Sequence, residues 1–142
     1  TVIAVLKEEK KSGLFSEAKW AEFASKSRAA IYGLRQWFER NEEAGNVVVG
    51  YGAAHKGNTF LNAVGKQSQN LKYVVDASHE KQGRFLPGSQ VPVLAPEQLN
   101  SANPTDVLIL PWNIASEILQ RVEVLAPNAR VWIAQPSMIQ LK

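Results

Sequence analysis

The sequence predicts an α/β protein with a doubly wound, mostly parallel sheet of about five strands, preceded by a long amphipathic helix. Short apolar runs alternate with segments of helical apolar spacing, which is typical of parallel strands joined by helical crossovers. The first run ends in a turn that contains Gly50, Gly52 and Gly57. We therefore expect a Rossmann-like core with strand order 3-2-1-4-5 and the glycine turn near the point where that order reverses.

Composition limits the possible partners. With 142 residues, of which 45% are hydrophobic, the chain is long enough for one domain with a core. Its net charge is +3, but charges of both signs alternate and no basic stripe contains aromatic residues, so a nucleic-acid partner is not expected. No apolar run is long enough to cross a bilayer, so no membrane partner is expected.

The absence of cysteine excludes disulfides and thiolate metal sites. The two histidines lack ligand-like spacing, so no metal site is predicted. A protein without cysteine also fits a reducing compartment, and we expect a cytoplasmic location.

The chain divides into an N-terminal helical segment, 1–45, and a Rossmann-like core, 46–142. We expect the first part to pack on the second, so that both form one domain. Residues 2–12 read as a short helix or tail that stops at Gly13.

One long helix is predicted over 17–43, with Ser16 as its N-cap and Gly45 at its end. Apolar side chains recur along it at helical spacing, and we interpret them as a face that packs in the core. This face contains Trp20, Phe23, Ala24, Ser27, Ile31, Leu34 and Phe38.

The core alternates between valine- and leucine-rich runs and helical segments. Strands are predicted at 47–51, 71–76, 91–94, 106–110 and 129–134. Helices are predicted to include 59–64, to begin at 96–99 and to cover 115–125.

The glycine turn joins a strand to a helix, which lets backbone N–H groups approach a phosphate at the positive end of the helix dipole. We therefore expect a nucleotide or nucleotide-like ligand. The dinucleotide fingerprint is only partly matched, because His55 replaces its third glycine, although Asp76 stands where a ribose-binding acid is found. The P-loop pattern has Thr59 in place but Asn58 instead of its lysine, which argues against phosphoryl transfer. The alternative is that the glycines merely permit the turn.

Two further loops follow strands at the same predicted edge of the sheet. Lys81 and Arg84 leave the second strand, and these cations suit phosphate or sugar hydroxyls. Trp112 and Asn113 follow the fourth strand and supply an aromatic face and an amide. Because ligands bind at the carboxyl ends of strands in open α/β sheets, the three loops predict a site for an anionic small molecule. His55 pairs with no recognisable nucleophile, so no catalytic residue is assigned.

The three loops lie in three segments, which follow one another along the chain as GYGAAHKGNTFLN at 50–62, VDASHEKQGRFLPG at 75–88 and LILPWN at 108–113. Together they resemble the C-terminal domain of the S-adenosylmethionine-dependent sugar C-methyltransferases, which methylate a ketosugar attached to a nucleoside diphosphate. The resemblance covers nearly the whole chain.

The resemblance implies that this chain is the nucleotide-sugar-binding domain of such an enzyme and is inactive alone. It implies no cofactor in this domain, with S-adenosylmethionine bound in a preceding methyltransferase domain that is also a partner. The glycines Gly50, Gly52 and Gly57 would shape the turn. The expected substrate-binding residues are these three glycines together with Tyr51, Lys56, Asn58, Thr59, Asp76, Lys81, Arg84, Trp112 and Asn113.

Two other readings stay open. The chain could be a non-catalytic Rossmann-like interaction module that has lost ligand binding, with the long helix and the tryptophans as its contact surface. An NAD(P)-dependent enzyme fits less well, because His55 interrupts the fingerprint and no catalytic Tyr-Lys pair is evident.

Overall fold

The computed structural model describes residues 1–142 and contains one six-stranded sheet with the order β3-β2-β1-β4-β5-β6. Neighbouring strands are parallel except for the antiparallel pair β5 and β6. The predicted α/β class and the order 3-2-1-4-5 are confirmed, and β6 is an additional strand. The strands are β1 (Val48–Tyr51), β2 (Val74–Val75), β3 (Val93–Leu94), β4 (Asp106–Ile109), β5 (Arg130–Ile133) and β6 (Ile139–Gln140).

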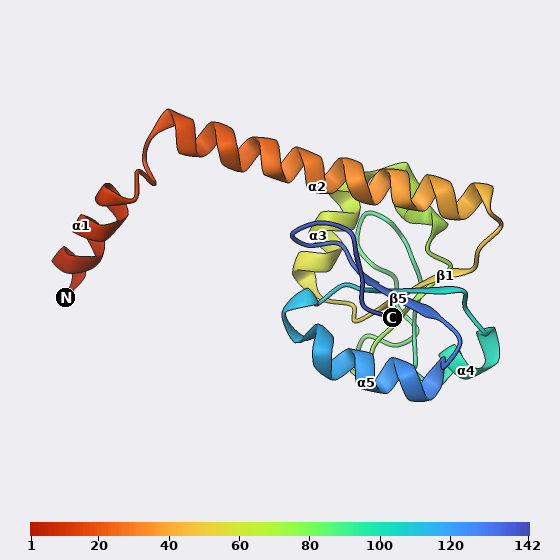
Figure 1. Ribbon diagram of the computed structural model, residues 1–142. Coiled ribbons are helices and arrows are strands. Elements are labelled where there is room, and N and C mark those ends of the chain that lie inside the picture. The colour runs from red at the N-terminus through yellow and green to blue at the C-terminus, as the bar shows by residue number, and fades with distance from the viewer.

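Helices cover both faces of the sheet (Figure 1). One hydrophobic cluster joins the sheet to α2 and α3, and a second joins the opposite face to α4 and α5. This three-layer arrangement is the one expected when buried parallel strands alternate with helices. The helices are α1 (Val2–Lys11), α2 (Glu17–Glu43), α3 (His55–Val64), α4 (Gln98–Ala102) and α5 (Ala115–Leu125), with 3-10 helices η1 (Lys66–Asn70) and η2 (Trp112–Ile114).

The C-terminal half of α2 forms part of the core. Its buried residues, Ala30, Leu34, Trp37, Phe38 and Asn41, recur at helical spacing along one face. Beside this face, Arg35 donates to the carbonyl oxygens of Val64 (2.6 Å) and Ala63 (3.1 Å). These carbonyls lie at the C-terminal end of α3, where helix geometry leaves acceptors free and a cation is favourable. Arg35 therefore ties α2 to the end of the helix that begins at the glycine turn.

The N-terminal half of α2 and the whole of α1 project away from the domain (Figure 1). We call residues 1–27 the arm. Trp20 and Phe23 are 58% and 65% exposed, and α1 has no buried residue. The prediction that the apolar stripe packs in the core is confirmed for Leu34 and Phe38 but is wrong for Trp20 and Phe23. Helical spacing identifies an apolar face, but it does not say whether the same chain supplies its partner.

Local contacts stabilise the projecting half of α2. The hydroxyl of Ser16 accepts from the N–H of Lys19 (3.3 Å), which confirms the predicted N-cap. Glu22 pairs with Lys26 (2.6 Å) and Lys19 (3.0 Å), and these two lysines lower the pKa of Glu22 to about 2. The stabilisation from these ion pairs is therefore fully present above the ordinary pKa range of carboxylates and is lost as the pH falls towards 2.

Although α2 is long, no helix here has the length and apolar character needed to span a bilayer.

Two glycines let α3 begin close to the end of β4. A Cβ on Gly57 would lie 2.6 Å from Cβ of Leu110, and one on Gly52 would lie 2.6 Å from Cδ of Pro111. Gly52 also has a φ of +87°, a conformation that side chains rarely adopt. The glycines therefore have a packing role whatever the turn binds.

A buried carboxylate organises the end of the sheet where the amino ends of the parallel strands lie. Asp106 is fully buried at the start of β4 and accepts from Arg130 through both oxygens (2.9 and 2.7 Å) and from Trp132 (2.8 Å). The hydrogen bond to Asp106 raises the pKa of Arg130 above its ordinary value. Because its charge is fully hydrogen-bonded inside the fold, we assign Asp106 a structural role.

Candidate functional site

The loops that follow β1, β2 and β4 meet at the edge of the sheet formed by the carboxyl ends of these strands. The strand order reverses between β1 and β4, so the glycine turn lies at the switch point, where open α/β sheets bind ligands.

The carboxylate of Asp76 ties two of these loops together. Its Oδ2 accepts from the N–H of Ala53 (2.7 Å) and from Nζ of Lys81 (3.1 Å), while its Oδ1 accepts from the N–H of Ser78 (2.8 Å). Lys81 also donates to the carbonyl oxygen of Ala53 (3.1 Å). Asp76 is only 9% exposed, so its charge is held inside a hydrogen-bond network rather than presented to a ligand.

The N-terminal end of α3 has free donors. Ala54 occupies the N-cap position, and no side chain caps the first turn. The hydrogen bonds of this helix begin with the N–H of Asn58, which donates to the carbonyl oxygen of Ala54 (2.9 Å). The N–H groups of His55, Lys56 and Gly57 therefore have no partner within the helix, and they lie at the positive end of its dipole.

A cavity of about 290 Å³ lies between this first turn and the loop after β2, and we call it the Arg84 cavity. Lys81 and Arg84 line it from the loop, and Arg84 is exposed and forms no ion pair. Asn58 and Thr59 line it from the helix. Oδ1 of Asn58 is buried without a hydrogen-bond partner, and the hydroxyl of Thr59 donates to the carbonyl oxygen of His55 (3.1 Å). The cavity thus combines cationic and amide groups with a helix N-terminus.

A second cavity, of about 270 Å³, lies at the switch point. Gly52, Asp76 and Pro111 line it, and it shares Ala54 and Lys81 with the Arg84 cavity. Lys81 therefore lies between the two hollows. The two cavities are thus adjacent along the edge formed by the carboxyl ends of the strands, which we call the rim.

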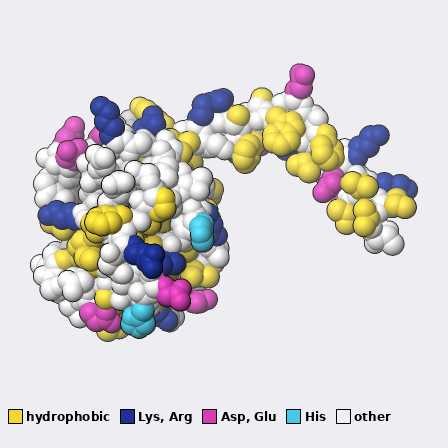
Figure 2. Space-filling view, turned by 180° about the vertical axis from the view of Figure 1, so that it is seen from behind, with side chains coloured by type: hydrophobic (Ala, Val, Ile, Leu, Met, Phe, Trp, Pro, Cys, Tyr) yellow, Lys and Arg dark blue, Asp and Glu magenta, His cyan; other side chains and the backbone are white.

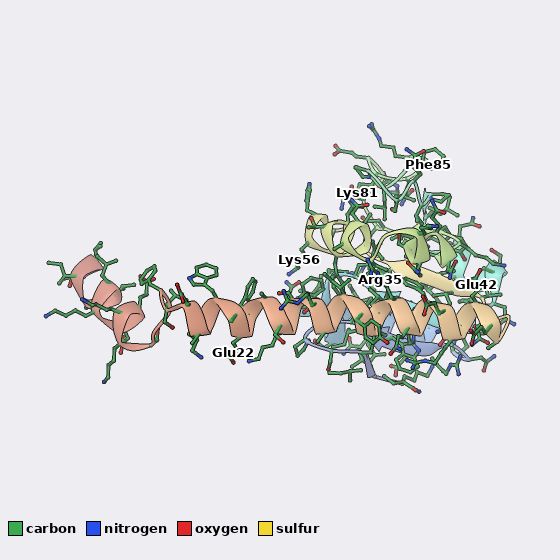
Figure 3. All side chains as sticks on the ribbon, turned by 90° about the horizontal axis from the view of Figure 1, so that it is seen from above. Glu22, Arg35, Glu42, Lys56, Lys81 and Phe85 are labelled. Carbon is green, nitrogen blue, oxygen red and sulfur yellow. The ribbon has the colours of Figure 1, made fainter.

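Lys56 and Trp112 form a separate cluster. Nζ of Lys56 lies 5.0 Å from the centroid of the Trp112 ring, and Phe60 meets this ring edge-on at 6.4 Å. Successive residues turn by about 100° around a helix, so Lys56 and Phe60 share one face of α3, while Asn58 lies on the opposite face. Figure 3 shows Lys56 on the side of α3 towards α2, and Lys81 on the far side.

The predicted residues are therefore brought together only in part. Asn58, Thr59, Lys81 and Arg84 share the Arg84 cavity, whereas Tyr51, Gly52, Asp76 and Lys81 share the switch-point cavity. Gly50 and Gly57 are packed against Val74 and Leu110, Asn113 is exposed, and neither cavity contains Lys56 or Trp112.

The structure adds two residues that the sequence reasoning did not select. Phe85 lines the Arg84 cavity, and Arg121 of α5 lines the switch-point cavity. Phe85 directly follows Arg84, so an aromatic residue next to a cation in a predicted loop is the sequence signal that could have identified it. Arg121 looks like any charged residue on the polar face of a helix. Arg121 and Tyr51 also border a larger hollow of about 500 Å³ beside α5, which contains no other predicted site residue.

We expect Asp76→Ala to lower the free energy of unfolding by about 2–4 kcal/mol, because the partly buried N–H groups of Ala53 and Ser78 and the ammonium of Lys81 lose their acceptor. Urea denaturation of the variant and the parent chain measures this loss. Glu80→Ala is the matched control, since Glu80 is an exposed carboxylate in the same loop without these bonds. Equal stability of the two variants would show that Asp76 does not hold the rim.

Comparison with known proteins agrees with this architecture. Residues 1–136 match the model of the C-methyltransferase C-terminal domain family. The chain is also similar to the C-methyltransferase NovU of Streptomyces niveus, with 34% identity over 127 residues. The match covers 89% of this chain but 30% of that protein, so the chain corresponds to less than a third of its length. The chain therefore belongs to the C-methyltransferase C-terminal domain family.

Proposed function

We propose that this domain binds the nucleotide-sugar substrate of an S-adenosylmethionine-dependent C-methyltransferase and does not transfer the methyl group by itself. The observation that carries the proposal is the Arg84 cavity. There, two cationic side chains face the uncapped first turn of α3, and the guanidinium of Arg84 has no ion-pair partner.

These groups suit a diphosphate. A guanidinium can bind two phosphate oxygens at once, and an ammonium adds a compact positive charge. The free N–H groups of His55 and Lys56 can donate to the same anion at the positive end of the helix. Sugar hydroxyls can then pair with side chains such as Asn58, whose amide oxygen lacks a partner.

The residues at the glycine turn do not fit the methyl donor. In a nucleoside site of the Rossmann type, the acid that ends the second strand holds the ribose hydroxyls. Here that acid is Asp76, and both of its oxygens already accept from Ala53, Ser78 and Lys81. We therefore place S-adenosylmethionine, the source of the electrophilic methyl group, in a preceding domain. This chain would hold and orient the sugar, and such positioning can supply much of a rate enhancement.

The arm supports a contact with that preceding methyltransferase domain. Its exposed apolar side chains gather along the projecting helices (Figure 2), and a large exposed apolar surface is typical of an interaction site. The matched relative has 70% of its length outside the region of similarity (100% − 30%), which leaves room for such a domain. The exposed residues are Val2, Ile3, Val5, Leu6, Leu14, Phe15, Trp20 and Phe23.

The same surface favours the second candidate function, a non-catalytic module that only makes protein contacts. The two candidates differ in what the rim does, because a contact module needs no ligand in the Arg84 cavity. The cytoplasmic location expected from the composition stays a prediction in either case.

We expect isothermal titration calorimetry to detect binding of thymidine diphosphate (dTDP) by this chain. Arg84→Gln should weaken the affinity by about tenfold or more, because a charge-assisted hydrogen-bonded pair is lost. Arg28→Gln is the control. Arg28 is exposed on α2 and does not line the cavity, so this variant should leave the affinity unchanged. Absence of dTDP binding by the parent chain would favour the contact module.

Mixing the chain with S-adenosylmethionine and a dTDP-ketosugar should give no methylated sugar, because Asp76, the acid that would hold the ribose of the methyl donor, is already bonded to Ala53, Ser78 and Lys81. Mass spectrometry of the sugar nucleotide measures the product. Turnover by residues 1–142 alone would contradict the proposed division of labour between domains.

A further inference from the structure

Phe85 is an exposed aromatic residue that no other side chain covers. The residue is 63% exposed, it belongs to neither hydrophobic cluster, and it forms no aromatic or cation–π pair. The other exposed aromatic ring on the domain, Tyr32, has its hydroxyl bound by Gln36 (2.8 Å). Exposing a phenyl ring gives the free fold no stability, so its position beside the Arg84 cavity points to a ligand contact.

The backbone holds Phe85 in a fixed place. It forms an antiparallel bridge with Pro92. On either side of this bridge, the N–H of Leu86 donates to the carbonyl oxygen of Val91 (2.9 Å), and the N–H of Val93 donates to the carbonyl oxygen of Arg84 (2.8 Å). Leu86 is 5% exposed and anchors the segment in the core. The ring therefore stands on a braced loop rather than on a free tip.

The surroundings of the ring are cationic. Arg84 precedes it directly, and Lys81 lines the same cavity. Figure 3 shows Phe85 and Lys81 on the same side of α3, away from α2. A ligand that fits this arrangement carries negative charge at one end and a flat, weakly polar ring at the other. A nucleoside diphosphate has both features.

We propose that the ring of Phe85 stacks against the nucleobase of a nucleoside diphosphate whose phosphates lie at Lys81 and Arg84. This inference rests on the proposed function and adds the position of the base to it. Stacking uses the flat face that all bases share, so Phe85 supplies affinity for the nucleoside without selecting its base.

Titration calorimetry with dTDP and with inorganic pyrophosphate tests the proposal. Phe85→Ala should weaken dTDP binding about 5- to 150-fold, the range that corresponds to the loss of one stacked base. It should leave pyrophosphate binding unchanged, whereas Arg84→Gln should weaken both. Phe85→Trp should retain dTDP affinity, because the indole ring also stacks.

Two further measurements separate stacking from an effect on the fold. The thymine methyl signal of dTDP should move upfield on binding to the parent chain, owing to the ring current, and this shift should shrink with Phe85→Leu. Phe15→Ala, at a similarly exposed phenylalanine of the arm (66%), should leave dTDP affinity unchanged.

The outcomes distinguish this inference from the proposed function. If Phe85→Ala leaves dTDP affinity unchanged while Arg84→Gln lowers it, the stacking proposal is overturned and nucleotide binding stands. Equal affinity of the parent chain for dTDP and pyrophosphate would also overturn stacking. No binding of dTDP by the parent chain would overturn both.

Discussion

The carboxylate of Asp76 is the interaction on which the rim of this domain depends. Its two oxygens accept from the turn after β1 and from the loop after β2, so these two segments cannot move independently. One consequence is that Lys81 and the residues after it are held opposite the first turn of α3. Another is that Asp76 and Lys81 are paired with each other, which leaves Arg84 and the helix N-terminus as the unpaired groups that can face an anion.

The two ends of the sheet use buried acids in different ways. At the amino ends of the strands, Asp106 accepts hydrogen bonds from Arg130 and Trp132 and joins β4 to β5. At the carboxyl ends, Asp76 is shared among loops that border two cavities. The two halves of the long helix α2 also differ. Its C-terminal half packs in the core, whereas its N-terminal half exposes apolar side chains to solvent.

The strand order, the long helix and the glycine turn could be predicted because each leaves a periodic or conformational signal in the sequence. The strand β6 could not, since two exposed residues have no period to detect. The role of Asp76 could not be predicted either, because the position of a carboxylate in the sequence does not show whether it accepts from a ribose hydroxyl or from a backbone N–H. Likewise, helical spacing placed Trp20 on an apolar face but could not show that this residue is exposed. Only the coordinates show that Lys56 lies over the ring of Trp112.

The central claim is that the free N–H groups of α3 and the loop cations hold one anion. The most direct test is a ¹H–¹⁵N correlation spectrum of the chain titrated with dTDP. We expect the amide signals of His55 and Lys56 to shift together with those of residues 81–85, while the signals of the arm, 1–27, stay unchanged. Shifts confined to the arm, or no saturable shift at the rim, would contradict it.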